Sequence, residues 1–361
     1  MIKMLYKITS VIIVACVVSC TGSNGASDKI ILLETTTDTV YFDANGGTGY
    51  MENQTIEHGT TDLLALNEFT HPDGRSFAGW SYTSEGAVKL INGAEFTMPE
   101  RDVRLYAKWA APAEWFEYTV YEGAVTITGL SSARDGSEKG IVMPAEIEGM
   151  PVTEIAGEAF RYQTDLVSLT LPDSVLTIGQ SAFYGCRSIT SLNLGNSVTT
   201  IGDSAFQYCY SLISMTIPDS VTYLGSRAFY YCEDLVSVEI GDSVEAIGDY
   251  TFSSCEDLVD VKFGDSVTSI GFRVFSSCGS LVSVSIPDQV TSVGGQLFFN
   301  CESLTSVVMG NSITSLESQT FYNCQNLTSV TLGRSLASIS NNAFYLCDNL
   351  SELSVHPENT V

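Results

Sequence analysis

Phenylalanine recurs at intervals of 23 residues through the C-terminal part of this 361-residue chain. Cysteine follows the same interval, always three residues after a phenylalanine, from Cys186 to Cys347. A fixed period is typical of repeat proteins, in which one unit cannot bury its apolar side chains alone and stacked units share a core. We therefore predict a solenoid with these side chains inside. The phenylalanines are Phe160, Phe183, Phe206, Phe229, Phe252, Phe275, Phe298, Phe321 and Phe344.

The segment after each phenylalanine has the pattern of a short strand. In Leu166-Val-Ser-Leu169-Thr-Leu171, the alternation of Leu169 and Leu171 with polar residues places the leucines on one face of a strand. The Leu-x-x-Leu-x-Leu pattern and the 23-residue period are both typical of leucine-rich repeats. The predicted fold class is mainly β: a leucine-rich repeat solenoid of 23-residue coils, preceded by a small β-grasp-like domain.

The repeats resemble one class of leucine-rich repeat proteins in detail. The unit Ala182-Phe183-x-x-Cys186-x-x-Ile189, followed by Leu194-Gly-Asn-Ser-Val198-Thr-x-Ile201-Gly202, is similar to the BspA-like class of surface proteins. The resemblance covers about residues 112–361. It implies a β-rich N-terminal cap over 111–154 and BspA-like repeats over 155–361. The terminal units depart from the pattern, with Gln163 in place of the first cysteine and Glu317 and Ser340 in place of the last two closing glycines.

A different module precedes the repeats. Three motifs occur in order: Val40-Tyr-Phe-Asp-Ala-Asn-Gly-Gly47, Phe77-Ala-Gly-Trp80 and Leu105-Tyr-Ala-Lys-Trp109. Together they resemble the Listeria–Bacteroides repeat, a small β-grasp-like domain, over residues 38–110. We expect Trp80 and Trp109 in its core, because large aromatic rings are usually buried. The resemblance implies a spacer or contact module and no reaction.

The first residues have the pattern of an export signal. Lys3 and Lys7 precede a short apolar stretch, and small residues lead to Cys20. The stretch is too short to span a bilayer but suits a signal peptide. Its end resembles the lipobox of bacterial lipoproteins, which predicts a lipoprotein signal peptide over 1–20, lipidation of Cys20 and a flexible tether over 21–37. A plain secretory signal with an incidental cysteine is the alternative.

The cysteine series could form disulfides or a row of free thiols. Equivalent residues in stacked coils have parallel Cα–Cβ bonds at the stacking distance, whereas a disulfide needs Cβ atoms that approach more closely and turn toward each other. We therefore expect buried, unpaired thiols that act as small apolar side chains. One thiol per coil along a straight line does not build a tetrahedral metal site, so no metal and no other cofactor is predicted.

Charge and histidine content limit the possible functions. The chain has 42 acidic and 16 basic residues, and its formal net charge is −26. Such a surface repels phosphate backbones, so we expect no nucleic-acid partner. Only three histidines are present, and the pairs Glu233-Asp234 and Glu256-Asp257 fit solvated turns better than an acid–base site. No catalytic residue is predicted, and we expect no enzyme.

An acidic row recurs after the strands, and its role has two interpretations. Its aspartates can cap local backbone N–H groups as Asx turns, or they can bind calcium weakly between stacked carboxylates. Asparagine interrupts the row at Asn196 and Asn311. The aspartates are Asp173, Asp219, Asp242, Asp265 and Asp288.

Tyrosines cluster in the first coils, at positions where later coils carry small polar residues. Exposed aromatic side chains at variable positions suit a protein-binding site, and packing between neighbouring coils explains them equally well. The strand face, rich in serine and threonine, suits contact with protein or glycan, or simple solvation. The predicted protein-binding residues are Tyr184, Tyr208, Tyr210, Tyr230 and Tyr231.

The resemblance implies a cell-surface lipoprotein adhesin, exposed on the bacterial envelope and held by its lipid anchor alone. Its expected partners are host extracellular-matrix or plasma proteins, or other bacterial surfaces, bound by a monomer. The alternative is a non-adhesive envelope scaffold or spacer.

Overall fold

The computed structural model describes residues 4–8, 11–18, 29–134 and 136–355, and side chains from residue 36 onward. The chain forms two compact units, Met1–Ala110 and Ala111–Val361. Cys20, the predicted lipidation residue, lies outside the described residues, as does the part of the predicted tether before Lys29. The described residues contain no helix that is long and apolar enough to cross a membrane.

Unit 1 is a small β domain without an α-helix among its described residues. Its sheet has the order β1-β2-β3-β8-β6. Strand β2 pairs with the N-terminal part of β3, and β4 pairs with the part that follows, Thr37 to Val40. The central strands β3 and β8 are parallel, and the remaining pairs are antiparallel. A separate two-stranded sheet joins β5 to β7. The strands are β1 (Met4–Ile8), β2 (Val11–Val18), β3 (Lys29–Asp43), β4 (Gln54–Glu57), β5 (Thr61–Leu63), β6 (Phe77–Ser81), β7 (Glu95–Thr97) and β8 (Val103–Trp109).

The core of unit 1 is aromatic, and both tryptophans lie in it as predicted. Trp80 is fully buried, and the indole N–H of Trp109 donates a hydrogen bond to the carbonyl of Ala44 at 3.0 Å. A side chain at Gly47 would meet the Trp109 ring at 2.5 Å, so the turn after β3 needs glycine there. The Asn-Gly-Gly motif therefore allows the turn to close over the tryptophan.

Unit 2 begins with a hairpin at one end of a sheet. Strands β9 and β10 are antiparallel and turn at Glu122-Gly123, where both residues have positive φ, as a tight hairpin requires. Strand β10 pairs in parallel with β13, and β12 pairs with β13 in the antiparallel direction. The elements are η1 (Ala113–Trp115), β9 (Phe116–Tyr121), β10 (Ala124–Leu130), β11 (Gly140–Val142), β12 (Glu146–Ile147) and β13 (Met150–Ile155).

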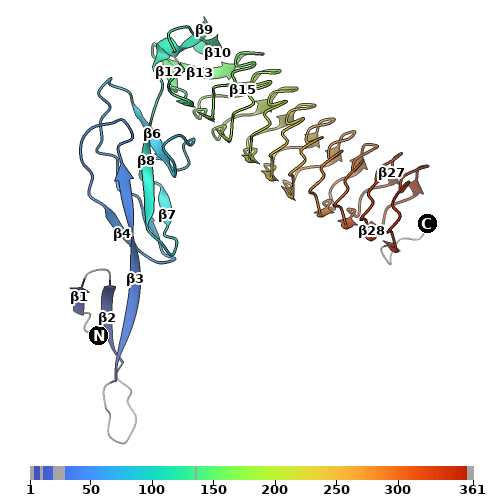
Figure 1. Cartoon of the computed structure of the whole chain (residues 1–361), viewed down its shortest axis with the longest axis horizontal. Coiled ribbons are helices and arrows are strands. Elements are labelled where there is room, and N and C mark those ends of the chain that lie inside the picture. The colour runs from blue at the N-terminus through green and yellow to red at the C-terminus, as the bar shows by residue number, and fades with distance from the viewer. Residues whose placement is uncertain (1–3, 9–10, 19–28, 135, 356–361) are drawn as a thin grey trace, which may run out of the picture. The chain divides into compact units, whose positions relative to one another are not determined.

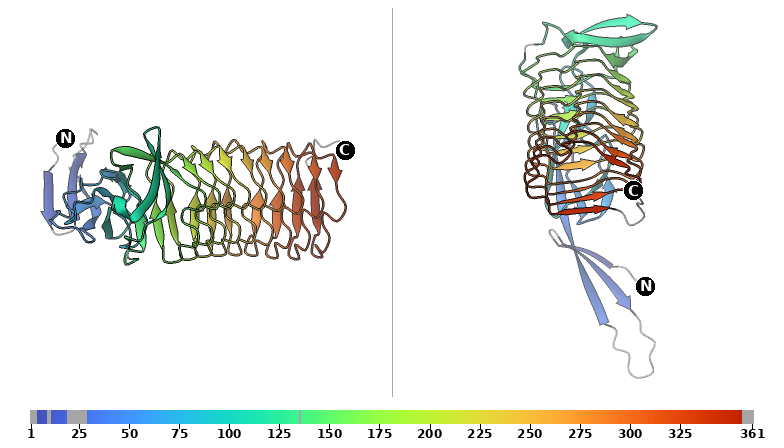
Figure 2. Two further views of the ribbon diagram at one scale, coloured as in Figure 1. Left: turned by 90° about the horizontal axis from the view of Figure 1, so that it is seen from above. Right: turned by 90° about the vertical axis from the view of Figure 1, so that its right-hand side faces the viewer.

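The rest of unit 2 is the predicted solenoid, with coils side by side (Figure 1). Each coil contributes two short strands, and each strand pairs in parallel with its equivalent 23 residues away, as Leu169 does with Leu192 and Ile178 with Ile201. Figure 2 shows successive strands aligned along the solenoid. The first row contains β14 (Ser168–Thr170), β16 (Ser191–Asn193), β18 (Ser214–Thr216), β20 (Ser237–Glu239), β22 (Asp260–Lys262), β24 (Ser283–Ser285), β26 (Ser306–Val308), β28 (Ser329–Leu332) and β30 (Glu352–Val355). The second contains β15 (Thr177–Ile178), β17 (Thr200–Ile201), β19 (Tyr223–Leu224), β21 (Ala246–Ile247), β23 (Ser269–Ile270), β25 (Ser292–Val293), β27 (Ser315–Leu316) and β29 (Ser338–Ile339).

The phenylalanine series forms the centre of the core, as the period predicts. Eight of the nine rings, from Phe160 to Phe321, are fully buried, and the last ring, Phe344, is half-buried. Neighbouring rings are nearly parallel, and their centroids lie 4.9 to 6.0 Å apart. Each coil therefore supplies one ring to a continuous stack that no single coil could bury.

The eight cysteines from Cys186 to Cys347 are free and buried, which confirms the prediction of an unpaired series. Each thiol donates to the carbonyl of the phenylalanine in the preceding coil, as Cys186 does to Phe160 at 2.9 Å and Cys255 to Phe229 at 3.3 Å. Burial raises the pKa of the Cys186 thiol to about 12. Burial likewise raises the pKa of the following thiols up to Cys301, so these lack the low pKa of a nucleophilic thiol. In the last coil, a hydrogen bond with Cys324 lowers the pKa of Cys347.

The acidic row differs from the local Asx turns that the sequence suggests. Asp219 Oδ1 accepts the backbone N–H of Asp242 at 3.1 Å, and Asp242 Oδ1 accepts that of Asp265 at the same distance. Each acceptor thus binds the equivalent residue of the next coil, 23 residues away. Asparagine also has an Oδ atom, and Asn311 accepts the N–H of Arg334 at 3.2 Å. The interruption at Asn311 therefore preserves the contact.

Candidate interaction surface on the solenoid

The turn segment around each core phenylalanine presents the predicted tyrosines. Its alternate N–H groups bond to the next coil, as in Arg227 to Asp249, Phe229 to Thr251 and Tyr231 to Ser253, at 2.8 to 3.0 Å. The residues two before and two after the phenylalanine have positive φ, for example 57° at Arg227 and 58° at Tyr231. The core ring points inward, and the side chains beside it are left at the surface of the turn.

The five predicted tyrosines lie together, and all five are half-buried. Tyr208 is at the centre, with ring centroids 5.3 Å from Tyr184, 5.8 Å from Tyr210, 6.2 Å from Tyr230 and 5.3 Å from Tyr231. The two interpretations of these residues are therefore compatible, because each ring packs on its neighbour and still presents part of its surface to solvent.

The cluster continues beyond these five residues. Tyr162 contacts Tyr184 at 5.5 Å, and Tyr250 contacts Tyr230 at 6.0 Å. We call the seven residues Tyr162, Tyr184, Tyr208, Tyr210, Tyr230, Tyr231 and Tyr250 the aromatic ridge. Tyr223, another tyrosine of the first coils, lies outside the aromatic ridge on β19. Its hydroxyl donates a hydrogen bond to Asp203 at 3.2 Å.

Arginine side chains cover several rings of the aromatic ridge. The Arg161 guanidinium lies 5.1 Å from the ring centroid of Tyr162 and 4.9 Å from that of Tyr184. Arg187 lies 5.4 Å from the Tyr210 ring, and Arg227 lies 4.8 Å from the Tyr250 ring. These distances are within the range of cation–π attraction. Sequence reasoning missed these contacts, although Arg161 and Tyr162 are adjacent in the chain.

The arginines concentrate positive charge on an otherwise acidic solenoid. Residues 155–361 contain six lysines and arginines, and four of the six, including Arg273, lie over aromatic rings of this turn surface. Arg161 also pairs with Glu158 at 2.7 Å. Burial raises the pKa of Tyr184 and of Tyr230, so both phenols stay neutral near pH 7.

A second aromatic group extends the same turn surface toward the C-terminal coils. Arg273 lies 5.4 Å from the Phe272 ring and 5.1 Å from the Phe299 ring, and Tyr250 contacts Phe272. Phe299 stacks on Tyr322 at 4.7 Å, and Tyr322 on Tyr345 at 5.4 Å. The sequence carried a signal for the last three, because each directly follows a core phenylalanine, as Tyr184 and Tyr230 do.

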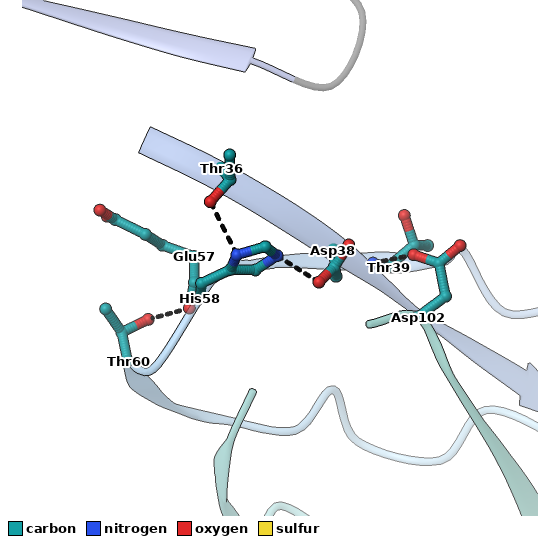
Figure 3. A network of polar contacts seen from close by, with 7 residues as sticks. All are labelled: Thr36, Asp38, Thr39, Glu57, His58, Thr60 and Asp102. Carbon is teal, nitrogen blue, oxygen red and sulfur yellow. Dashed lines mark hydrogen bonds and ion pairs between the residues drawn. The ribbon is translucent and has the colours of Figure 1, made fainter. Parts of the chain in front are cut away.

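One polar network in unit 1 has the residue types of a hydrolase triad (Figure 3). The Nδ1 atom of His58 is 2.7 Å from the hydroxyl of Thr36, and its Nε2 atom pairs with Asp38. Thr36 and Asp38 lie on one face of β3, and His58 directly follows the paired strand β4. Cross-strand pairing therefore accounts for the contact, and the network joins the two strands.

The acidic and cysteine residues do not gather into a metal site in the described part of the chain. No group of three or more histidine, cysteine, aspartate or glutamate side chains there has the arrangement to hold a metal ion.

Comparisons with known proteins place the chain in a class of bacterial repeat proteins. The family model for the BspA type leucine rich repeat region matches residues 153–281 and 268–361, and the model for the Listeria-Bacteroides repeat domain matches residues 39–108. The chain belongs to the BspA-type leucine-rich repeat family. Proteins of these families are bacterial surface proteins, and the repeat fold is typically a non-enzymatic scaffold for protein binding.

Solved structures with the same repeat architecture resemble the chain at low identity. A leucine rich cell surface protein from Faecalibacterium prausnitzii is 24% identical over 69% of this chain and 95% of its own, with a TM-score of 0.42. A leucine-rich repeat protein from Bacteroides ovatus is 24% identical over 68% and 76%, with a TM-score of 0.41. One from T. pallidum is 27% identical over 67% and 91%, with a TM-score of 0.36. No curated protein matches.

Proposed function

We propose that this chain is a lipid-anchored bacterial surface adhesin that binds host or bacterial macromolecules through the aromatic ridge. The observation that carries the proposal is the run of partly exposed tyrosines in successive coils, covered in part by arginines. Tyrosine and arginine are the residue types enriched at binding hot spots. Rings that already pack on each other lose little conformational freedom when a partner covers them.

Adhesion is a binding function, and the proposal includes no reaction, cofactor or nucleic-acid partner. The expected partners are extracellular-matrix or plasma proteins of a host, or the surfaces of other bacteria. Family membership supports a surface location and a binding scaffold, and the identity of the bound molecule is the part that experiment must supply.

Binding of the full chain to immobilised fibronectin, fibrinogen and whole co-resident bacteria tests the proposal. The variant Tyr230→Ser/Tyr231→Ser copies Ser253-Ser254 of the next coil, so the turn can accept it. We expect affinity to fall at least about tenfold, as for loss of a hot spot. The control Tyr223→Thr copies Thr200 of the preceding coil and removes an exposed tyrosine outside the ridge.

A scaffold without an external ligand is the competing proposal. Absence of saturable binding to every probe, together with loss of envelope integrity when the chain is deleted, would favour the scaffold over the adhesin.

Anchoring through Cys20 has its own test. Cells that express the full chain should incorporate radiolabelled palmitate into it, and the Cys20→Ser variant should remain unlabelled. Equal labelling of the two proteins would exclude this anchor.

A further inference from the structure

Four consecutive coils expose an aliphatic side chain at one position, seven residues after the core phenylalanine. The residues are Ile213, Val236, Val259 and Val282, and their exposed fractions are 53%, 42%, 48% and 47%. The N–H of Val236 bonds to the carbonyl of Ile213 at 2.8 Å, and that of Val259 to Val236 at 2.9 Å. Ile213, Val236 and Val259 therefore lie side by side on the surface, and Val282 has the equivalent position in the next coil. We call these four residues the aliphatic strip.

The fold does not require aliphatic residues at this position. Other coils place Thr190, Thr305 and Thr328 there, and each hydroxyl donates to a carbonyl of the preceding coil at 3.0 to 3.3 Å. The first coil has Val167 there, but that side chain is half-buried and Thr190 separates it from Ile213, so the uninterrupted row of exposed aliphatic side chains spans four adjacent coils. An exposed row of this kind gains free energy when a partner covers it.

Carboxylates border the aliphatic strip. Glu233-Asp234 and Glu256-Asp257 lie two or three residues before Val236 and Val259 in the same coils. The N–H of Asp257 donates to the carbonyl of Glu233 at 3.0 Å, so the two acidic pairs lie in directly bonded coils. Burial, with the Glu256 and Asp234 carboxylates, raises the pKa of Glu233. The border therefore repels anions and attracts cations.

An open hollow interrupts this acidic border next to Val282. Its volume is about 390 Å³, and its lining includes Glu256, Asp257, Ser280 and Glu302. Gly279 also lines it and belongs to the coil between those of Glu256 and Glu302. A side chain at Gly279 would fit, because its Cβ would meet nothing closer than the Glu256 carbonyl at 3.7 Å. The hollow thus exists because this coil has glycine where others have Tyr210 or Gln325.

We propose that the aliphatic strip and this carboxylate-walled hollow form one docking surface for a basic, extended peptide segment of a partner protein. Aliphatic side chains of the segment pack on the strip, and a lysine or arginine enters the hollow. The strip covers three coil steps, about 14 Å, which corresponds to about four residues of extended chain. The paired carboxylates match the charge of such a segment, and they exclude an acidic one. The surface uses none of the aromatic ridge residues, so the inference does not depend on the proposed function.

Labelled peptides of about ten residues test this inference against the full chain by fluorescence anisotropy. One peptide alternates valine and lysine, one alternates valine and glutamate, and one alternates serine and lysine. We expect saturable binding of the valine–lysine peptide alone, weakened by salt because part of the attraction is between charges. Equal binding of the serine–lysine peptide would show general charge attraction and would overturn the inference.

Variants copied from other coils separate the docking surface from the fold. Val236→Thr/Val259→Thr introduces the threonine that three other coils have at this position. Gly279→Gln fills the hollow with the glutamine that another coil has as Gln325. Each variant should weaken binding of the valine–lysine peptide at least about tenfold and leave thermal unfolding nearly unchanged. Thr305→Val extends the aliphatic strip by one coil and should strengthen binding. Unchanged affinity in both weakening variants, with their folds intact by circular dichroism, would refute the docking surface.

Discussion

The thiol of Cys232 donates a hydrogen bond to the backbone carbonyl of Phe206, a residue of the preceding coil, with an Sγ···O distance of 3.3 Å. The same carbonyl accepts the N–H of Cys209 within its own coil at 3.2 Å. The thiol therefore satisfies the second lone pair of a buried oxygen. The first coil has Gln163 at the cysteine position, and no preceding coil there supplies a phenylalanine carbonyl.

Because these thiols are buried, we expect them to react very slowly with a thiol reagent. Burial raises the pKa of Cys255 and of Cys301 to about 12. At pH 8 a thiol with that pKa is about one part in 10⁴ thiolate, whereas an ordinary cysteine is about one quarter thiolate. In the full chain carrying Cys16→Ser, Cys20→Ser and Cys347→Ser, release of thionitrobenzoate from Ellman's reagent should be about 10³-fold slower than after unfolding. Cys347 is removed as well because a hydrogen bond with Cys324 lowers its pKa. Rapid labelling of the native protein would contradict the burial.

The phenylalanine stack predicts a strong dependence of stability on position. Phe229→Ala should lower the free energy of unfolding by about 3–5 kcal/mol, because it leaves a cavity between two stacked rings. Phe344→Ala should cost clearly less, since that ring is half-buried and stacks on Phe321 in the terminal coils. Urea unfolding followed by circular dichroism measures both. Equal losses would contradict the stacked core.

The acidic row predicts a difference between two substitutions of one residue. Asp242→Asn keeps the Oδ acceptor for the N–H of Asp265 and removes one of the stacked negative charges, so stability should stay equal or rise. Asp242→Ala leaves that N–H without its side-chain acceptor and should cost about 1 kcal/mol. Thermal unfolding of the two variants compares them directly. A less stable asparagine variant would show that the carboxylate charge itself is needed.

The identical residues that repeat in register were predictable, and the contacts that depend on the conformation of polar and charged side chains were not. The core phenylalanines and free cysteines follow from one rule, that equivalent residues stack. The contact from Asp219 to Asp242 obeys the same rule. A local Asx turn would also explain an aspartate at this position, so the sequence did not distinguish a local turn from a contact between coils. The arginine contacts also join equivalent positions, because Arg161 and Tyr184, like Arg227 and Tyr250, are 23 residues apart. The period thus carried a signal for them, but it does not specify the side-chain conformation that places a guanidinium over a ring.

The carboxylates beside the aliphatic strip predict a pH-dependent effect of one substitution. The pKa of Glu233 is raised, chiefly by burial and then by Glu256 and Asp234, so the folded state favours its protonated form. Its contribution to stability is therefore present below the unfolded pKa of about 4.5 and is lost as the pH rises through the folded value. Glu233→Gln imitates the protonated form. At pH 7 it should raise the melting temperature by about 1–3 °C, the range for removing one like-charge contact. At pH 4 the native glutamate binds its own proton, and the two melting temperatures should converge. A melting temperature that falls at pH 7 would show that the Glu233 charge stabilises the coil, contrary to the direction of its pKa.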